Sequence, residues 1–466
     1  MTGSPPIESS ARPTFTGTIR IRLRTRTRRR NLELGLLLFA IAIGLASLML
    51  VQLGSLGRID SGLVGLVIGL SLLVIVVHIA LRVVAPEADP FLIPIATLLN
   101  LIGIAEITRI DIARGDVGWE AYGVRQVAWS AIAILCALAV LFVVRNHRVL
   151  QRYRYVAGFV AIALLGLPFL PLIGLNVNGA QAWIHLGVAT FQPGEIAKIA
   201  LAVFFAGYLV TARDSLSMVG RRFLGITFPR LRDLGPILVV WLLSMAVIVF
   251  QQDLGSGLLY FGIFLVMIYV ATARAGWVIL GLVLFGGGAF VAILTRPYVG
   301  ARFNGWLNTF DATLFDQRGG SYQLAQGLFG LADGGLAGTG LGRGSPDITP
   351  LAESDFIVAS LGEELGLIGL FAILVLYLVF VSRGFHIGFA GQDDFGRLLG
   401  VGLSFVIALQ VFIVVGGVTR VIPLTGLTTP FLAAGGSSLV ANWVIVALLV
   451  RLSDSVRAQP RLVIEA

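Results

Sequence analysis

The chain has 466 residues, of which 57% are hydrophobic and only 13% are charged. A soluble domain carries about 25% charged residues, so this composition excludes an ordinary soluble protein. The formal net charge is +9, but no motif of a nucleic-acid module is present. We therefore expect the basic side chains to meet anionic membrane lipids and to set topology, with no nucleic-acid partner. The single cysteine, Cys136, excludes an internal disulfide.

Twelve apolar stretches follow an arginine-rich N-terminal segment, residues 1–30, for which we predict a disordered cytoplasmic tail. Each stretch is about long enough to cross a hydrocarbon core of about 30 Å, and none alternates as a barrel strand would. We therefore predict an all-α polytopic membrane protein. The stretches are 32–54, 62–84, 91–108, 124–144, 155–174, 194–211, 236–251, 254–273, 276–295, 356–382, 398–418 and 430–451.

The distribution of arginine predicts the orientation of these helices. The N-terminal segment carries eight arginines, loop 145–154 carries four and loop 212–235 carries five, whereas loop 175–193 carries none. Cytoplasmic loops are enriched in basic residues, so both termini are expected to be cytoplasmic. A short C-terminal tail, 454–466, is then cytoplasmic as well, and loop 296–354 faces outside.

Two outer loops differ from ordinary connections. Loop 175–193 holds Trp183 among polar residues, which suits an amphipathic segment at the membrane interface. Loop 296–354 is far longer than most connections, and such loops are usually functional or disordered. Because it contains several aromatic residues, we expect it to fold on the membrane surface as the outer wall of a cleft.

Four motifs carry candidate chemistry. In QPGEIAK, Glu195 and Lys198 share a helix face; they form either a local ion pair or a cation aimed into the cleft. Asp253 in QQDLGSG either caps the next helix or lines the cleft. In the glycine-rich run 333–344, the glycines permit close backbone approach or form a phosphate-binding nest, to which Arg343 would add a charge.

The fourth motif, ESDFIVASLGEELG, contains Asp355 where the outer loop meets a helix. Asp355 either caps that helix or acts as a single acid or base. Glu363 lies about 12 Å further along the helix axis, and Glu364 points to the opposite side. Neither can form a close catalytic carboxylate pair with Asp355, which disfavours a two-carboxylate hydrolase. His185 has no second histidine at metal spacing, so we predict no metal site.

In order along the chain, these motifs resemble those of the SEDS family (FtsW, RodA and SpoVE). The matching blocks are NGAQAWIHLG, FQPGEIAK, QQDLGSG, GGSYQLAQGLFGLADGGLAGTGLG, ESDFIVASLGEELGLIG and GLTTPFLAAGGSS. The resemblance covers about residues 91–453 and implies a bundle of ten helices. Residues 31–90 would then form two extra transmembrane helices, an extension similar to that of elongation-type actinobacterial members.

The resemblance also implies an activity and a set of site residues. Members of the family are peptidoglycan glycosyltransferases that polymerise lipid II outside the cytoplasmic membrane, each with a class B penicillin-binding protein as partner. The family's essential aspartate corresponds to Asp355 and its remaining motif residues to the substrate contacts. Those substrate contacts are Glu195, Lys198, Asp253, Tyr322 and Gln323, to which Trp183, Arg302 and Arg343 are added as candidate contacts for sugar or diphosphate.

The chain departs from the family pattern at several positions. Glu353 replaces a histidine, Ala182 replaces a basic residue, and Gln252 replaces a proline. The roles of the missing side chains therefore cannot be carried over. No cofactor is expected with certainty, although a divalent cation would suit a diphosphate substrate. Two alternative functions stay open: a transporter that flips lipid II, and a non-catalytic scaffold of the cell-wall machinery.

Overall fold

The fold was analysed in a computed structural model that describes residues 26–177, 179–187, 189–216, 222–223, 226–227, 235–315 and 321–458. Residues 1–25 of the predicted tail lie outside the described residues. Its last five residues are helical, because α1 begins at Arg26. Most of loop 212–235 and the end of the C-terminal tail also lie outside this part of the chain. The last helix ends at Arg457, inside the range expected for the C-terminal tail.

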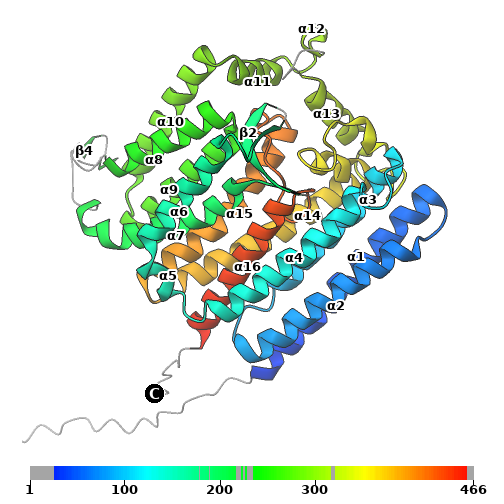
Figure 1. Cartoon of the computed structure of the whole chain (residues 1–466), viewed down its shortest axis with the longest axis horizontal. Coiled ribbons are helices and arrows are strands. Elements are labelled where there is room, and N and C mark those ends of the chain that lie inside the picture. The colour runs from blue at the N-terminus through cyan, green and yellow to red at the C-terminus, as the bar shows by residue number, and fades with distance from the viewer. Residues whose placement is uncertain are drawn as a thin grey trace, which may run out of the picture.

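Ten helices in the described part of the chain are long and apolar enough to cross a membrane, which confirms the polytopic α-helical class. They are α1 (Arg26–Leu56), α2 (Ser61–Val84), α3 (Leu92–Arg114), α4 (Tyr122–Val143), α7 (Pro193–Leu216), α9 (Leu254–Thr272), α10 (Ala275–Thr295), α14 (Ile357–Phe389), α15 (Asp394–Val418) and α16 (Gly436–Arg457). They run side by side in one bundle (Figure 1).

At two of the twelve predicted stretches the apolar helix is present but shorter than expected. The stretch 155–174 forms α6 (Arg154–Gly166) and the short turn η1 (Leu167–Phe169), after a one-turn helix, α5 (Arg148–Arg152). The stretch 236–251 forms α8 (Gly235–Ala246), followed by a single π turn, η3 (Val247–Gln251). Counted together with the turn that follows it, each of α6 and α8 is about 25 Å long at 1.5 Å per residue, shorter than the ten long helices. Pro168 lies in the turn that ends the first, and Asp253 is the N-cap of α9, which begins directly after the second.

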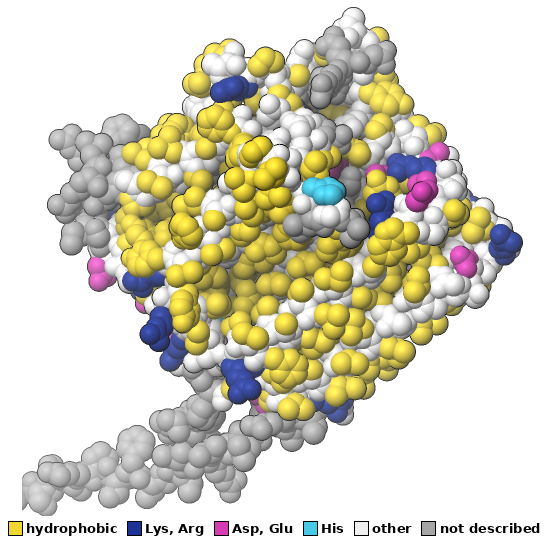
Figure 2. Space-filling view, viewed as in Figure 1, with side chains coloured by type: hydrophobic (Ala, Val, Ile, Leu, Met, Phe, Trp, Pro, Cys, Tyr) yellow, Lys and Arg dark blue, Asp and Glu magenta, His cyan; other side chains and the backbone are white. Residues whose placement is uncertain are grey.

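The outer surface of the bundle is apolar, as contact with lipid requires. Figure 2 shows a broad band of hydrophobic side chains across the middle of one face, with Lys and Arg gathered towards its edges. Large side chains such as Phe39, Phe159 and Phe371 are more than half exposed on α1, α6 and α14. Exposed apolar side chains on so many helices indicate a bundle that lies within a bilayer.

The two N-terminal helices lie along one side of the bundle (Figure 1), where α1 packs on α3 and α2 packs on α4. The α1–α3 contact is close at Gly44, where an added Cβ would lie 2.4 Å from Leu101. A buried polar link joins α1 to α2: His78 Nδ1 lies 2.9 Å from Glu33 Oε1, and Arg82 Nε donates to His78 Nε2 at 3.0 Å. These two helices are therefore an integral part of the packed bundle.

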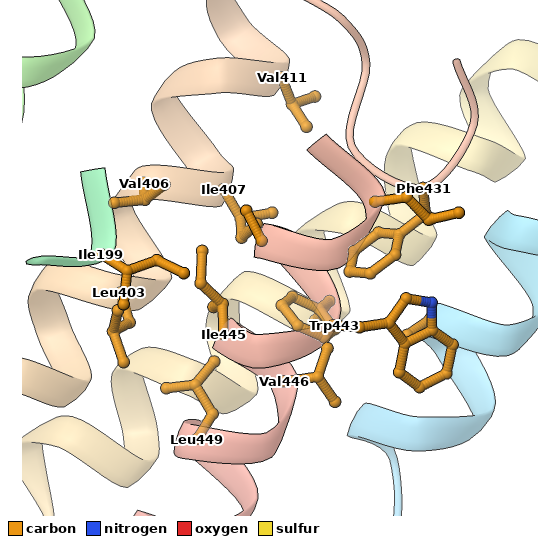
Figure 3. Close-up of a cluster of buried hydrophobic side chains, with 14 of the residues drawn as sticks. Ile199, Leu403, Val406, Ile407, Val411, Phe431, Trp443, Ile445, Val446 and Leu449 are labelled. Carbon is orange, nitrogen blue, oxygen red and sulfur yellow. The ribbon is translucent and has the colours of Figure 1, made fainter. Parts of the chain in front are cut away.

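The centre of the bundle is formed by α7, α15 and α16, with the loop that precedes α16. Figure 3 shows Ile199, Leu403 and Ile445 from these helices meeting in one cluster, with Phe431 of the loop beside Trp443. The rings of Phe431 and Trp443 are 6.2 Å apart and nearly perpendicular. Because Phe431 is anchored in this core, the loop 419–435 is rigidly placed.

The loops predicted to face outside gather at the end of the bundle opposite the start of α1 and the end of α16 (Figure 1). Loop 175–193 forms an antiparallel sheet of β1 (Gly174–Val177), β2 (Ala180–Leu186) and β3 (Ala189–Phe191), so the fold is not wholly helical. Loop 296–354 contains α11 (Pro297–Leu307), α12 (Ala312–Phe315), α13 (Tyr322–Gly334) and η4 (Pro346–Ile348). A second sheet, β4 (Arg222–Phe223) and β5 (Ile226–Thr227), lies in loop 212–235.

The helix α14 is interrupted at Gly366, whose φ is 69° and ψ is −176°. The glycine-rich loop after α13 pairs with this break. Thr339 N donates to Glu363 O, Gly340 N to Glu364 O, and Leu367 N to Gly335 O, each at 3.0 Å. These bonds satisfy the backbone groups that the break would leave unpaired in an apolar environment. The first part of α14, which follows Asp355, is thus held by the outer loop.

Candidate active site

Asp355 lies in a tight turn directly before α14 and is half-buried. The turn is closed by Ser354 N and Phe356 N, which both donate to Leu351 O at 3.1 Å. The N-cap residue of α14 is Phe356, and no side chain makes a capping hydrogen bond there. The helix-cap interpretation of Asp355 is therefore wrong. Gly426 faces the carboxyl group, since a Cβ there would lie 3.7 Å from Asp355 Oδ2.

Three charged side chains act on the Asp355 carboxyl group. Burial raises its pKa from 3.8 to about 6, while the Arg302 guanidinium opposes this shift and the Glu353 and Asp253 carboxylates add to it. Burial dominates because it removes water from the charged form. A carboxyl group with a pKa near 6 is a stronger base than an ordinary aspartate and is still mostly ionised at neutral pH.

Arg302 comes from α11 and is held by the loop before α16. Its Nη1 donates to Leu424 O at 3.1 Å, and its guanidinium lies 5.1 Å from the centre of the Tyr298 ring. A second link joins the same two segments: Trp306 Nε1 donates to Arg420 O at 3.0 Å. The half-buried guanidinium is therefore held by the loop before α16, the same loop whose Gly426 faces Asp355, and it keeps donors for an anion.

Asp253 caps α9, as one of the two sequence interpretations proposed. Its Oδ1 accepts from Ser256 N at 2.9 Å, and its Oδ2 accepts from the Ser256 hydroxyl at 2.6 Å. Burial raises its pKa, which the two hydrogen bonds from Ser256 partly offset. Gln252, which replaces the family's proline, has a φ of 57° that proline cannot adopt. Asp253 therefore has a local structural role and also lies near enough to act on Asp355.

Lys198 is fully buried, and its three donors are occupied. Its Nζ donates to Glu195 Oε2 at 2.5 Å, to Gln410 Oε1 at 2.9 Å and to Asn442 Oδ1 at 3.3 Å. The motif itself is tied to α16, because Gln192 N donates to Ser437 Oγ at 2.8 Å. The observed geometry is that of the local ion pair, one of the two alternatives for this motif.

The glycine-rich run 333–344 surrounds a carboxylate of the protein itself. Glu364 accepts from Gly342 N at 2.8 Å, from Gly344 N at 3.3 Å and from Arg109 Nε at 2.9 Å. The nest that could have bound a phosphate is therefore filled, and that interpretation is wrong. At Gly338 an added Cβ would lie 2.2 Å from Glu364 O, so close backbone approach explains this glycine. Arg343 is exposed on the same run.

The remaining predicted contacts lie at the end of the bundle where loops 175–193 and 296–354 gather (Figure 1). The ring of Tyr322, at the start of α13, is partly exposed and meets Phe315 edge to face at 5.4 Å. Gln323 beside it is half-buried. Trp183 is half-buried on β2, opposite Leu175 of β1. The structure thus brings Arg302 and Asp253 to Asp355, whereas the contacts of Tyr322, Gln323 and Trp183 with a substrate stay predictions.

One feature of the site was missed by sequence reasoning. The buried Glu353 carboxylate forms an ion pair of 2.9 Å with Arg114 at the end of α3, and Glu353 O accepts from Ala434 N at 2.7 Å. The turn that carries Asp355 is therefore anchored on both α3 and the loop before α16. Only the departure at Glu353 from the family motif pointed to it, and nothing in the sequence pointed to Arg114. Among the described residues, no three His, Cys, Asp or Glu side chains could hold a metal ion.

Comparison with known proteins identifies relatives that match most of the chain. A family model described as cell cycle protein, FtsW/RodA/SpoVE, matches residues 91–458. The peptidoglycan glycosyltransferase RodA of Mycobacterium bovis is 44% identical over 383 residues, which are 82% of this chain and 81% of that protein. Stage V sporulation protein E of Bacillus subtilis is 32% identical over 372 residues, 78% of this chain and 96% of that protein.

Among solved structures, one chain from a study entitled "Structural coordination of polymerization and crosslinking by a peptidoglycan synthase complex" has a similar fold. The TM-score is 0.62 at 23% identity, and the match covers 80% of this chain and 99% of that chain. The helices α1 and α2 precede the region that the family model matches.

Proposed function

This chain belongs to the FtsW, RodA and SpoVE family and is a peptidoglycan glycosyltransferase, and we propose that it polymerises lipid II with Asp355 as the general base. The observation that carries the proposal is the half-buried Asp355 carboxyl group, which does not cap its helix and whose pKa Arg302 affects. Of the two other carboxylates that act on it, Asp253 caps α9 and Glu353 is paired with Arg114, so Asp355 is the candidate for a single general base.

The proposed step is an inverting displacement. The 4-hydroxyl oxygen of the acceptor sugar attacks the anomeric carbon of the donor, and its proton passes to the Asp355 carboxylate. The bond from that carbon to the diphosphate oxygen breaks, and the electron pair leaves with the lipid diphosphate. One inversion converts the α-linked donor into a β-1,4 linkage. The raised pKa of Asp355 makes proton transfer at neutral pH more favourable.

Arg302 is the best candidate for the charge that stabilises the leaving diphosphate. It is half-buried near Asp355, and one of its donors already fixes its position on Leu424 O. A preorganised cation aimed at a developing charge contributes strongly in a site with little water. We propose that Lys198 instead stabilises the helix bundle through Glu195, since its donors are occupied. Arg343 stays a prediction as a second phosphate contact.

The proposal includes a partner and an orientation. A class B penicillin-binding protein is the proposed partner, because a similar fold occurs in a peptidoglycan synthase complex.

Both termini are proposed to be cytoplasmic. In support, the Arg29 guanidinium, near the start of α1, forms an ion pair with the Glu87 carboxylate at 3.5 Å. The backbone N–H of Glu87 donates to Asp454 Oδ1, near the end of α16, at 2.8 Å. The two ends therefore lie on the same side of the bundle.

The direct test is polymerisation of labelled lipid II by the purified protein in detergent, with and without a cognate class B penicillin-binding protein. Polymer is the expected product. A detergent micelle does not separate two compartments, and a transporter forms no glycosidic bond, so a transporter would give no polymer in this assay. If no polymer forms with the partner present, the transporter or scaffold function replaces the glycosyltransferase. Adding EDTA and then excess Mg²⁺ in the same assay tests the predicted divalent cation.

A further inference from the structure

A cavity lies between α1, α3 and α14, and Asp355 is not among the residues that line it. Its volume is about 260 Å³, and its walls are almost entirely apolar. Residues that line it include Ile43 and Ser47 of α1, Ile102 and Glu106 of α3, and Leu365 and Ala372 of α14. We call it the α1–α3–α14 crevice. Because α1 precedes the region matched by the family model, one wall of the crevice is contributed from outside that region.

Glu106 is the polar side chain that distinguishes this crevice from an ordinary packing gap. It is 1% exposed, and neither of its carboxyl oxygens has a hydrogen-bond partner in the protein. The nearest arginine on the same helix, Arg109, is already engaged with Glu364 and with Gly344 O. A buried polar group without a partner is costly, and most such groups are satisfied. The protein therefore supplies no polar group to the Glu106 carboxyl oxygens, and a molecule bound in the crevice could supply one.

The depth and size of the crevice limit what can supply that group. Glu106 lies eight residues before the end of α3, about 12 Å along the helix axis, so it is within the apolar layer. A charged head group is expensive at that depth. A helix about 10–12 Å across is too wide for a cavity of this volume. A hydrocarbon chain that carries one neutral polar group meets both limits.

We propose that the α1–α3–α14 crevice binds a neutral single-chain membrane amphiphile, whose hydroxyl group pairs with the Glu106 carboxyl group. A hydroxyl group both donates and accepts, so it can satisfy Glu106 in either protonation state. The chain of the ligand lies against the apolar walls and leaves towards lipid past Ala372, which is exposed at the edge of α14. This site is independent of the reaction at Asp355.

The test uses a diazirine-bearing hexadecanol as photoreactive probe on the full-length protein in lipid nanodiscs, followed by peptide mapping. We expect cross-links on the crevice walls of α1, α3 and α14. Unlabelled hexadecanol should compete about fivefold better than hexadecane, the value of one net hydrogen bond. Glu106→Leu should abolish that preference for the alcohol, whereas Glu106→Gln should keep it, because an amide also donates and accepts.

A matched pair of variants separates the crevice from the general lipid surface. Ala372→Phe fills the edge of the crevice and should reduce cross-linking several-fold. Ile368→Phe lies on the exposed face of the same helix, 67% exposed, and should leave cross-linking unchanged. Equal competition by hexadecane and hexadecanol would overturn the proposal, as would cross-links that are insensitive to Ala372→Phe. Loss of probe binding only when a partner protein is added would show that a protein segment, not an amphiphile, occupies the crevice.

Discussion

At the scale of single residues, the charges around Asp355 set how it works. Burial raises its pKa to about 6, Arg302 opposes that shift, and Glu353 and Asp253 add to it. The pKa of Asp355 is therefore lowered by Arg302 and raised by the neighbouring carboxylates. Arg302 keeps the base ionised, and Glu353 keeps it basic, while the Arg114 guanidinium holds Glu353 in place.

The first prediction is a pH profile. Because the base must be ionised, the rate of polymerisation should rise with pH through the pKa of Asp355, with an acid limb near pH 6. Glu353→Gln removes a charge that raises this pKa, so the limb should move to lower pH. Arg302→Met removes the charge that lowers it, so the limb should move to higher pH. The measurement is the pH dependence of initial rates at low lipid II concentration.

A control for this profile is Asp347→Asn, which removes an exposed acid from the same outer loop. Its acid limb should match that of the wild type. Acid limbs that shift in the same direction for Glu353→Gln and Arg302→Met would contradict the account, because the two charges should change the pKa of Asp355 in opposite directions. A general loss of structure would not produce opposite shifts.

The second prediction concerns the buried pair of Glu195 and Lys198. Lys198→Met leaves the Glu195 charge buried without its cation, which costs about 3–5 kcal/mol in comparable pairs. The melting temperature in detergent should therefore fall strongly. The double variant Glu195→Gln/Lys198→Met removes both charges and should recover most of the loss. If the single and double variants melt together, the pair has no coupled structural role.

At the scale of elements, the interruption of α14 is the feature on which the outer loop depends. At Gly366 an added Cβ would lie 2.2 Å from Gly338 N, in a backbone conformation with φ of 69°. Side chains are strained there, and the neighbouring atom is backbone that cannot move aside. The glycine-rich loop and the helix that follows Asp355 are therefore matched to each other.

The third prediction follows from this contact. Gly366→Ala should destabilise the protein by at least about 1–3 kcal/mol and lower the melting temperature. Gly69→Ala is the matched control, since Gly69 is exposed within α2 and nothing lies within 4 Å of an added Cβ. It should be neutral or stabilising by about 0.5–1 kcal/mol. A Gly366→Ala protein as stable as Gly69→Ala would disprove the contact.

The sequence alone predicts where the long helices lie, but not where each helix ends or how the loops fold. Long apolar stretches such as α2 and α15 follow from composition, because only helices satisfy the backbone in lipid. The shorter lengths of α6 and α8 do not follow, since hydropathy does not mark the residue at which a helix ends. The filled glycine nest could not be predicted either: Glu364 and Gly342 meet only because the loop folds back on the break in α14.

Some residues of the site could likewise be predicted from the sequence, and others could not. Asp355 and Asp253 were found because each stands at a boundary between loop and helix, which short sequence motifs mark. Arg114 was missed because its contact with Glu353 depends on how α3 lies against the turn before α14. Arg302 was proposed without a position, and its place beside Asp355 depends on the contact of α11 with Leu424. Contacts between distant segments require the packed bundle.

At the scale of the whole molecule, the proposal requires Asp355 to lie outside the cell, on the side opposite both termini. The fourth prediction tests this orientation with single cysteines in a Cys136→Ser background. Glu120→Cys, in the exposed turn between α3 and α4, should react with a membrane-impermeant maleimide in intact cells. Arg148→Cys, exposed at the first residue of α5, should react only after permeabilisation. The reverse pattern would place Asp355 in the cytoplasm and exclude the proposed reaction.

The central claim is that Asp355 accepts the proton of the attacking hydroxyl group. The measurement that tests it most directly compares wild type with Asp355→Asn, each saturated with the penicillin-binding partner, for both lipid II binding and single-turnover polymerisation. A lost general base lowers the rate by about 10²–10⁴-fold. We predict a loss of at least this size, with lipid II affinity and melting temperature nearly unchanged. Polymerisation by Asp355→Asn at close to the wild-type rate would contradict the account.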